Sequence, residues 1–177
     1  MFKDPEHVLD KFILGDGRIV ADFGAGSGAY TLAAARRVGD HGKVYAIDVQ
    51  RDLLLRIKNS ATQARLHNVD IIWGDIEKRG GTGLKDESVD AVIISNVLFQ
   101  TEDKSAAIRE AYRILKSGGR VLFVEWSDSS GGVGPSGEYL IAKNEARSIF
   151  ESTQFSFERD IAAGIHHYGM VFRKTKP

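Results

Sequence analysis

The sequence contains no cysteine and no excess of charge of either sign. Without cysteine, the chain has no disulfide framework, no thiolate metal site and no cysteine nucleophile. Its 24 Lys and Arg residues balance its 24 Asp and Glu residues, so the formal net charge at pH 7 is zero. This neutrality argues against a nucleic-acid module that depends on a strong positive field, although a few local contacts are enough to hold an RNA substrate.

Long apolar runs are also missing. No stretch approaches the 18 or more apolar residues that a membrane span requires, and the N-terminal MFKDPEHVLDKF is charged throughout, unlike a signal peptide. A length of 177 residues is typical of one domain, and 42% hydrophobic with 27% charged residues is an ordinary composition for a folded globule. We therefore expect a single cytoplasmic domain over residues 1–177, with a short N-terminal helix at about 5–14.

Short β-rich runs alternate with helical patterns along the chain. The patterns predict strands at 18–23, 43–49, 69–73, 89–95, 120–126, 155–161 and 166–172. They predict helices at 29–38, at 51–66, around 108–115 with Thr101 as N-cap and Gly118-Gly119 as the stop, and across 139–150. Only four residues separate the last two strands, so these should form an antiparallel hairpin. The alternation predicts an α/β fold with a doubly wound, mostly parallel sheet and helices on both faces.

Ligands of such sheets bind beyond the carboxyl ends of the strands, so the polar residues at those ends are the candidates for a site. The first strand leads into Asp22-Phe23-Gly24-Ala25-Gly26-Ser27-Gly28, where glycines allow a sharp turn and a close approach of a ligand. Asp48 lies at the end of the second strand, and Asp75 and Asn96 follow the third and fourth strands. Each feature alone is also explained by an ordinary turn or cap. Together they predict a nucleoside-sized site.

These motifs resemble those of class I S-adenosylmethionine-dependent methyltransferases, in particular the small-molecule group (UbiE-like, methyltransferase type 11) that includes quinone-biosynthesis C-methyltransferases. The segment 22–28 matches the family's acidic-x-Gly-x-Gly-x-Gly motif, and Gly74-Asp75-Ile76 matches its adenine-contacting step. The segment 115–119 matches the family's Leu-Lys-Pro-Gly-Gly turn, with Ser117 in place of the usual proline. The resemblance spans residues 5–175 and implies a Rossmann-like, seven-stranded sheet of order 3-2-1-4-5-7-6 with an antiparallel last strand.

The same resemblance implies S-adenosylmethionine as the cofactor and S-adenosylhomocysteine as its product. It implies that Gly24 and Gly26 lie against the methionine part, Asp22 near its ammonium group, Asp48 at the ribose, Asp75 and Ile76 at the adenine, and Asn96 near the methionine part or the methyl group. Ala25 and Val49 are further expected cofactor-binding residues. The glycine turn also fits a dinucleotide fingerprint, which leaves a NAD-binding Rossmann protein as an alternative. The acid two residues before the first glycine and the terminal hairpin fit the methyltransferase better.

The acceptor side of the site has its own candidates. His166, His167 and Tyr168 open the last strand, whose beginning lies at the active edge because that strand is antiparallel. Histidine suits proton transfer near neutral pH, and neighbours in a strand point to opposite faces, so only one of the two histidines is expected to face the site. Both can instead be packing or surface residues. No third ligand accompanies them, so no metal site is predicted.

Phe99, Gln100 and Trp126 are further candidates for contacts with the acceptor, for which a small molecule is the favoured class. Basic clusters such as Arg36-Arg37 are short, which disfavours RNA as the acceptor. In related enzymes an Asn-Pro-Pro-Tyr-like sequence marks methylation of planar nitrogens, and Asn96-Val97-Leu98-Phe99 stands in its place here, which disfavours that reaction. No inserted substrate-cap domain is expected. An open site also suits a protein or RNA acceptor, or a small molecule enclosed by a second subunit in a homodimer. A non-catalytic, cofactor-binding regulatory subunit is a further alternative.

Two segments can cover this site. The Ser- and Gly-rich stretch 127–137 leaves the same sheet edge and is either a lid or a simple crossover loop. The N-terminal helix can lie over the cofactor, with Phe2 and Lys3 taking part.

Overall fold

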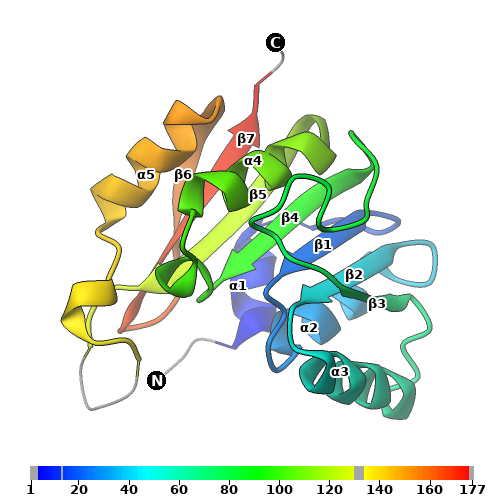
Figure 1. Ribbon diagram of the computed structural model, residues 1–177. Helices are drawn as coiled ribbons and strands as arrows, with labels where there is room; N and C mark the ends of the chain where they lie inside the picture. Colours follow the sequence, from blue (N-terminus) through cyan, green and yellow to red (C-terminus); the bar gives the residue numbers. More distant parts are fainter. Residues whose placement is uncertain (1–3, 13, 130–133, 176–177) are drawn as a thin grey trace.

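The computed structural model describes residues 4–12, 14–129 and 134–175 (Figure 1). Within these ranges seven strands form one sheet: β1 Ile19–Phe23, β2 Lys43–Asp48, β3 Val69–Trp73, β4 Val89–Ser95, β5 Leu115–Trp126, β6 Phe155–Ala162 and β7 His167–Lys174. The helices are α1 Pro5–Phe12, α2 Ala29–Val38, α3 Arg51–Gln63, α4 Lys104–Ile114 and α5 Lys143–Ser152, with short 3₁₀ turns η1 Leu98–Gln100 and η3 Gly137–Tyr139. None of the helices in the described ranges is both long and apolar enough to cross a bilayer.

The strands are arranged in the order β3-β2-β1-β4-β5-β7-β6. All neighbouring pairs are parallel except those of β7, which runs antiparallel to both β5 and β6. The doubly wound α/β fold, the strand order and the terminal hairpin predicted from the sequence are thereby confirmed. Because the chain moves from β1 outward to β3 and then returns to the other side of β1, the switch in strand order falls between β1 and β4.

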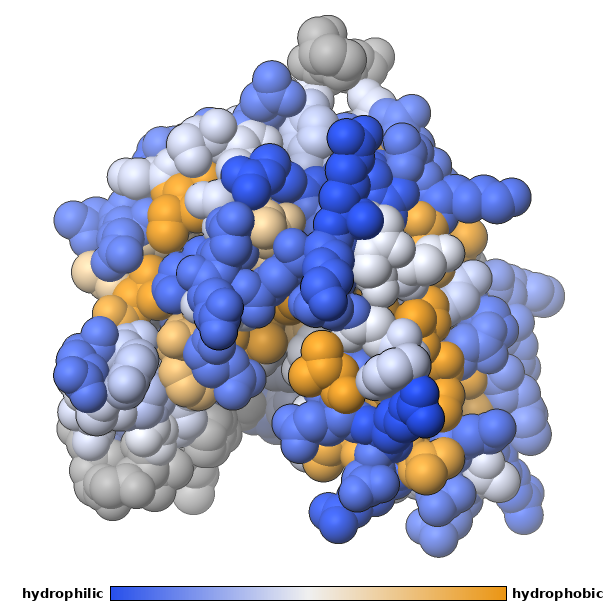
Figure 2. All heavy atoms as spheres, viewed as in Figure 1, coloured by the Kyte–Doolittle hydropathy of each residue, from blue (hydrophilic) through white to orange (hydrophobic). Residues whose placement is uncertain are grey.

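Helices cover both faces of the sheet, because strand residues alternate between the two sides. Val20 and Val44 pack with apolar residues of α1 and α2 on one face. Ala21, Phe23 and other residues of opposite parity pack with α4 and α5 on the other face, seen in front of the sheet in Figure 1. That outer surface is largely hydrophilic across α4 (Figure 2). The apolar stripes of the helices therefore pack against the sheet, as their periodicity predicts.

Besides the start of β5, which lies at Leu115 and not at residue 120, three predicted boundaries are wrong. Asp103, not Thr101, caps α4: its Oδ1 accepts the Ala106 N–H at 2.8 Å, while the Thr101 hydroxyl donates to the Leu98 carbonyl. Helix α4 ends at Ile114, before the glycine pair, because the Arg113 and Ile114 carbonyls accept hydrogen bonds from residues 87 and 88 and the chain joins the sheet at once.

The third boundary is that of α5, which begins at Lys143 and not near residue 139. Tyr139 lies in the preceding 3₁₀ turn with an exposed side chain, so it does not contribute to the buried helix face. In the stretch 127–137, residues 130–133 lie outside the described residues, as do Phe2 and Lys3. The suggested covering roles of these segments stay predictions.

Candidate functional site

Two adjoining cavities lie at the carboxyl ends of β1, β2 and β4, where the strand order switches. Their volumes are about 420 and 210 Å³, and they share Gly24, Asp48, Gln50 and Gln100. We call the two together the strand-end cleft. The cleft brings together every cofactor-side candidate of the sequence: Asp22, Gly24, Ala25, Gly26, Asp48, Val49, Asp75, Ile76 and Asn96.

The glycine turn packs closely against the loop that follows β4. Gly24 has a φ of +64°, and a Cβ placed there would lie 2.4 Å from Cγ2 of Val97. Gly26 also has a positive φ, of +54°, but the nearest atom to its hypothetical Cβ is a backbone oxygen at 3.7 Å. Glycine is therefore needed at position 24 for both conformation and packing, whereas at position 26 it leaves open space toward the cleft.

Asp48 joins the glycine turn to the start of α3. Its Oδ2 accepts the Gly26 N–H at 3.0 Å, and its Oδ1 accepts the Gln50 N–H at 2.9 Å. Each carboxylate oxygen has a second lone pair, so both can still accept a hydrogen bond from a ligand hydroxyl. The arrangement orients a nearly buried carboxylate toward the cleft, as binding of a ribose requires.

Asp22 lies deeper, at the base of the cleft. Only 2% of its surface is exposed, and its Oδ2 accepts a 2.6 Å hydrogen bond from the Thr31 hydroxyl. Burial, with a smaller contribution from the negative charge of Asp48, raises the pKa of Asp22 to about 7. A cationic group placed beside this carboxyl would favour its ionised form and return the pKa toward its ordinary value.

Among the described residues, the side-chain oxygen of Asn96 is a hydrogen-bond acceptor that no donor reaches. The backbone of Asn96 has a φ of +53°, in the left-handed region, and its N–H donates to the Val124 carbonyl at 2.9 Å. Its Oδ1 is buried and has no hydrogen-bond partner among the described residues. Leaving a buried acceptor unpaired costs about 1–3 kcal/mol, so this atom fits a ligand that donates a hydrogen bond.

The charge of the cleft has one sign. Its described lining contains four acidic residues, Asp22, Asp48, Asp75 and Glu77, and neither lysine nor arginine. Asp75 is held by the Glu77 N–H, which donates to Oδ1 at 3.0 Å, and Lys78 Nζ lies 3.3 Å from its other oxygen. An electronegative lining attracts a cationic ligand and repels an anionic one such as a pyrophosphate.

The two histidines separate as the strand geometry predicts. His167 lines the larger cavity and is 6% exposed, with its ring centroid 4.2 Å from that of Trp126. Burial and the neighbouring His166 lower the pKa of His167, so its imidazole is neutral at pH 7 and can accept a proton. His166 instead directs Nδ1 toward Asp128 Oδ1, at 2.9 Å.

The predicted acceptor-side residues are not all brought to the cleft. Gln100 borders both cavities, but Phe99, Trp126 and Tyr168 line neither. Tyr168 lies on the opposite face of β7 from His167, where its hydroxyl donates to the Ile141 carbonyl at 2.8 Å. Its ring packs beside Phe123 in the core under α5, so alternation along the strand carries it away from the cleft.

Sequence reasoning missed several lining residues. Tyr30 and Ser95 border the larger cavity, and burial raises the pKa of Tyr30 to about 12. Pro5 and Ala163 close the same cavity from α1 and from the β6–β7 turn. Tyr30 directly follows the glycine turn on α2, so its position was a usable signal. Ala163 carried no signal, because only the packing of distant segments brings it here.

Glu125, at the end of β5, supports the cleft from behind. It is fully buried, and its carboxylate accepts the Trp126 N–H at 3.0 Å and the Phe99 N–H at 3.3 Å. Burial raises its pKa to about 7 despite these hydrogen bonds. Glu125 therefore anchors the η1 turn, which places Gln100 beside the cleft.

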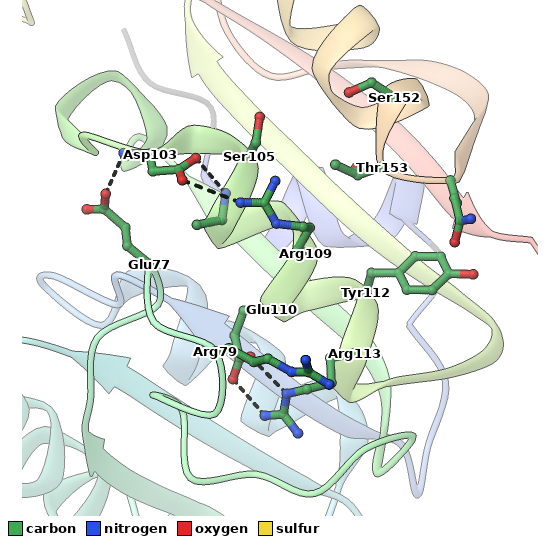
Figure 3. A pocket seen from close by; sticks show the side chains of 12 residues that line it. Glu77, Arg79, Asp103, Ser105, Arg109, Glu110, Tyr112, Arg113, Ser152 and Thr153 are labelled. Carbon is green, nitrogen blue, oxygen red and sulfur yellow. Dashed lines mark hydrogen bonds and ion pairs between the residues drawn. The ribbon is translucent and has the colours of Figure 1, made fainter.

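A larger hollow lies elsewhere on the described structure. This hollow, of about 810 Å³, runs along α4 to the end of α5 (Figure 3). Its lining holds three acidic and three basic side chains. Arg113 pairs with Glu110 at 2.7 Å, and Arg109 pairs with Asp103 at 3.4 Å. Because its charges are internally compensated, this hollow has no clear preference for a charged ligand.

Within the described ranges, no group of three or more His, Cys, Asp or Glu residues could hold a metal ion.

Comparison with known proteins gives a consistent match. Residues 21–123, more than half of the chain, match the family described as a methyltransferase domain. Human arsenite methyltransferase is 35% identical over 127 residues, which are 67% of this chain and 32% of that protein. The ubiquinone/menaquinone biosynthesis C-methyltransferase UbiE of Escherichia coli is 33% identical over 115 residues, 63% of this chain and 43% of that protein. The chain thus spans less than half the length of these relatives.

Solved structures resemble the chain over nearly all of its length. A SAM-dependent methyltransferase from Aquifex aeolicus matches with a TM-score of 0.89 and 27% identity, covering 97% of this chain and 90% of that one. CrArsM, an arsenic(III) S-adenosylmethionine methyltransferase from Chlamydomonas reinhardtii, matches with a TM-score of 0.72 and 26% identity, covering 91% and 64% of the two chains.

Proposed function

We propose that this chain, which belongs to the methyltransferase domain family, binds S-adenosylmethionine in the strand-end cleft and transfers its methyl group to a small organic molecule. The family resemblance expected from the motifs is confirmed by the match over residues 21–123. The binding of the cofactor, the roles of the individual residues and the acceptor are our proposals.

One observation carries the choice of cofactor: the described residues that line the cleft include four acids and neither lysine nor arginine. S-adenosylmethionine carries a sulfonium and an ammonium group, whereas NAD carries a pyrophosphate. The carboxyl of Asp22 and the unpaired Oδ1 of Asn96 suit the ammonium group, which is charged and donates hydrogen bonds. Asp48 suits the ribose hydroxyls, and the smaller cavity beside Asp75 and Ile76 suits the adenine.

When bound, the cofactor supplies an electrophilic methyl carbon on a sulfonium, whose C–S bond breaks with the electron pair remaining on sulfur. The main task of the chain is to hold an acceptor atom in line with that carbon, because correct orientation alone lowers such barriers substantially. His167 is the base we assign. Its neutral imidazole accepts the proton of the acceptor atom when that atom carries one at the working pH.

The acceptor end of the cleft suits a small, uncharged or cationic organic molecule. Its wall is formed by aromatic and apolar side chains, including Tyr30, Val124 and Ala163, with His167 as the basic group. The two relatives named above are called an arsenite and a quinone-biosynthesis methyltransferase. Trivalent arsenic is a soft centre that prefers thiolates, and these 177 residues include no cysteine. An organic acceptor is therefore the better match. Enclosure by a second copy of the chain remains a prediction.

Calorimetric titration tests the cofactor assignment. We expect saturable binding of S-adenosylmethionine and none of NAD, and we expect Asp48→Ala to weaken binding far more than it lowers the free energy of unfolding. Binding of NAD alone would reject the assignment. A screen with methyl-labelled cofactor against small-metabolite, protein, RNA and lipid fractions then tests the acceptor class. Cofactor binding without transfer to any fraction would instead favour a regulatory, non-catalytic subunit.

A further inference from the structure

A second cavity of ligand size lies at the opposite edge of the sheet from the strand-end cleft. It has a volume of about 460 Å³ and sits at the beginnings of β1, β4 and β5 and the end of the antiparallel β7. We call it the amino-end cavity. Four basic side chains border it, Arg18, Lys116, Arg120 and Arg173, against one acidic side chain, Asp90.

Asp90 cannot neutralise this set. Lys116 Nζ lies 3.0 Å and Arg18 Nη1 lies 3.5 Å from the same oxygen, Oδ1. The other oxygen, Oδ2, accepts the Ile19 N–H at 2.9 Å. One carboxylate therefore serves two cations and a backbone donor, which leaves excess positive charge on this side of the cavity.

The other side of the cavity is also positive. Arg120 Nε pairs with Glu158 Oε2 at 2.9 Å, but Glu158 also pairs with Arg159. Arg173 forms no ion pair with any described residue, and its Nε donates only a long, 3.4 Å hydrogen bond to the Gly118 carbonyl. A guanidinium group has five N–H donors, so both arginines keep donors that are available to an anion.

The cations are arranged around a concave opening and not spread over a flat surface. The turn Ser117-Gly118-Gly119 forms part of the wall, and the position of a Cβ on Gly118 has no atom within 4 Å. The side chains of Lys116 and Arg120 are 44% and 37% exposed, so their charges are less screened than those of fully extended surface residues. The volume falls in the range typical of small-molecule sites.

The sign of this cavity is a local property, since the whole chain has no net charge. Among the described lining residues, the charged ones of the strand-end cleft are all acidic and those of the amino-end cavity are mainly basic, so the two ends of the sheet favour ligands of opposite charge. We propose that the amino-end cavity binds a compact organic dianion of the phosphate-monoester class. Guanidinium groups match such oxyanions by forming two parallel hydrogen bonds.

Titration with glycerol 3-phosphate tests the proposal, with uncharged glycerol as the matched ligand. At low and constant ionic strength we expect one binding site with a dissociation constant of about 1 mM or tighter, and no binding of glycerol. Arg173→Gln and Arg18→Gln should each weaken binding by about fivefold or more, because each removes a charge-assisted contact. Arg56→Gln is the control, since Arg56 is an exposed residue of α3 outside this cavity.

The outcomes separate clearly. Absence of saturable binding, binding of glycerol, or an equal loss in Arg56→Gln would overturn the proposal. Displacement of glycerol 3-phosphate by a short RNA at much lower concentration would show that the surface serves a polymer, which would also overturn it. Titration of the same variants with S-adenosylmethionine should give the affinity of the native protein, so failure of this proposal and failure of the proposed function are distinguishable.

Discussion

Replacing Asp22 by asparagine should stabilise the protein and weaken cofactor binding at the same time. Asp22 is buried, and its pKa is raised to about 7, against an ordinary value of about 4 in the unfolded chain. The stability associated with such a group is complete below the unfolded pKa and is lost as the pH rises through the folded pKa. At pH 8 the native protein therefore carries the full cost of ionising a buried carboxyl.

The size of the effect follows from the shift. Three pKa units correspond to about 4 kcal/mol, which is an upper bound because proteins relax around buried charges. Asp22→Asn removes the titration and keeps an oxygen to accept the Thr31 hydroxyl hydrogen bond. We expect its gain in free energy of unfolding over the native protein to grow by about 2–3 kcal/mol between pH 5 and pH 8. Urea denaturation at several pH values measures this difference.

Cofactor binding should change in the opposite sense. If the ammonium group requires ionised Asp22, the apparent dissociation constant of the native protein rises about tenfold for each pH unit below 7. Asp22→Asn should bind weakly at every pH and lose this dependence, as measured by calorimetry in the same buffers. Asp160→Asn is the control, because Asp160 forms only an exposed ion pair with Lys143. A variant less stable than the native protein at pH 8, or one with unchanged cofactor affinity, would refute the reasoning.

Three further substitutions, with His166→Gln as a control, test other parts of the site. Gly24→Ala should cost about 2 kcal/mol or more in the free energy of unfolding, measured with urea, because the φ is positive and the added Cβ meets Val97. Glu125→Gln should speed hydrogen exchange of the η1 amides and raise the cofactor dissociation constant severalfold, because a single amide oxygen replaces the two carboxylate oxygens that accept hydrogen bonds. Unchanged hydrogen exchange would contradict the anchoring role of Glu125. If the atom that receives the methyl group carries a proton, His167→Gln should lower kcat about 100-fold or more and flatten the acid limb of the pH profile of kcat. His166→Gln should leave kcat unchanged, and equal losses in both would contradict the assignment of the base.

Much of the candidate site could be predicted from the sequence, because it depends on local pattern and on one rule of topology. Glycines after a β-rich run indicate a tight turn, and acids or amides after successive runs mark strand ends. In a parallel sheet those ends share one edge. Asp22, Asp48 and Asn96 therefore had to lie close together once the strands were identified. The hairpin at the end of the chain followed from the length of its connection alone.

Other features depend on segments far apart in the chain, and periodicity does not report on them. The end of α4 is set by hydrogen bonds from residues 87 and 88 and not by the glycine pair that follows. The raised pKa of Asp22 depends on its burial and on its neighbour Asp48, which no local pattern specifies.

The sequence by itself determined the α/β class, the terminal hairpin and the position of the strand-end cleft, since these follow from periodicity, connection lengths and residue types at strand ends. The order of the strands was implied by the resemblance of the motifs to the family, and the structure confirms it. Only the tertiary structure decided that His167, not His166, faces the cleft, and that Tyr168 is turned into the core. The tertiary structure alone also placed acidic side chains at one end of the sheet and mainly basic ones at the other, in a chain whose net charge is zero. The physical reason is that burial and electrostatic fields act through space, so they depend on which distant segments fold together.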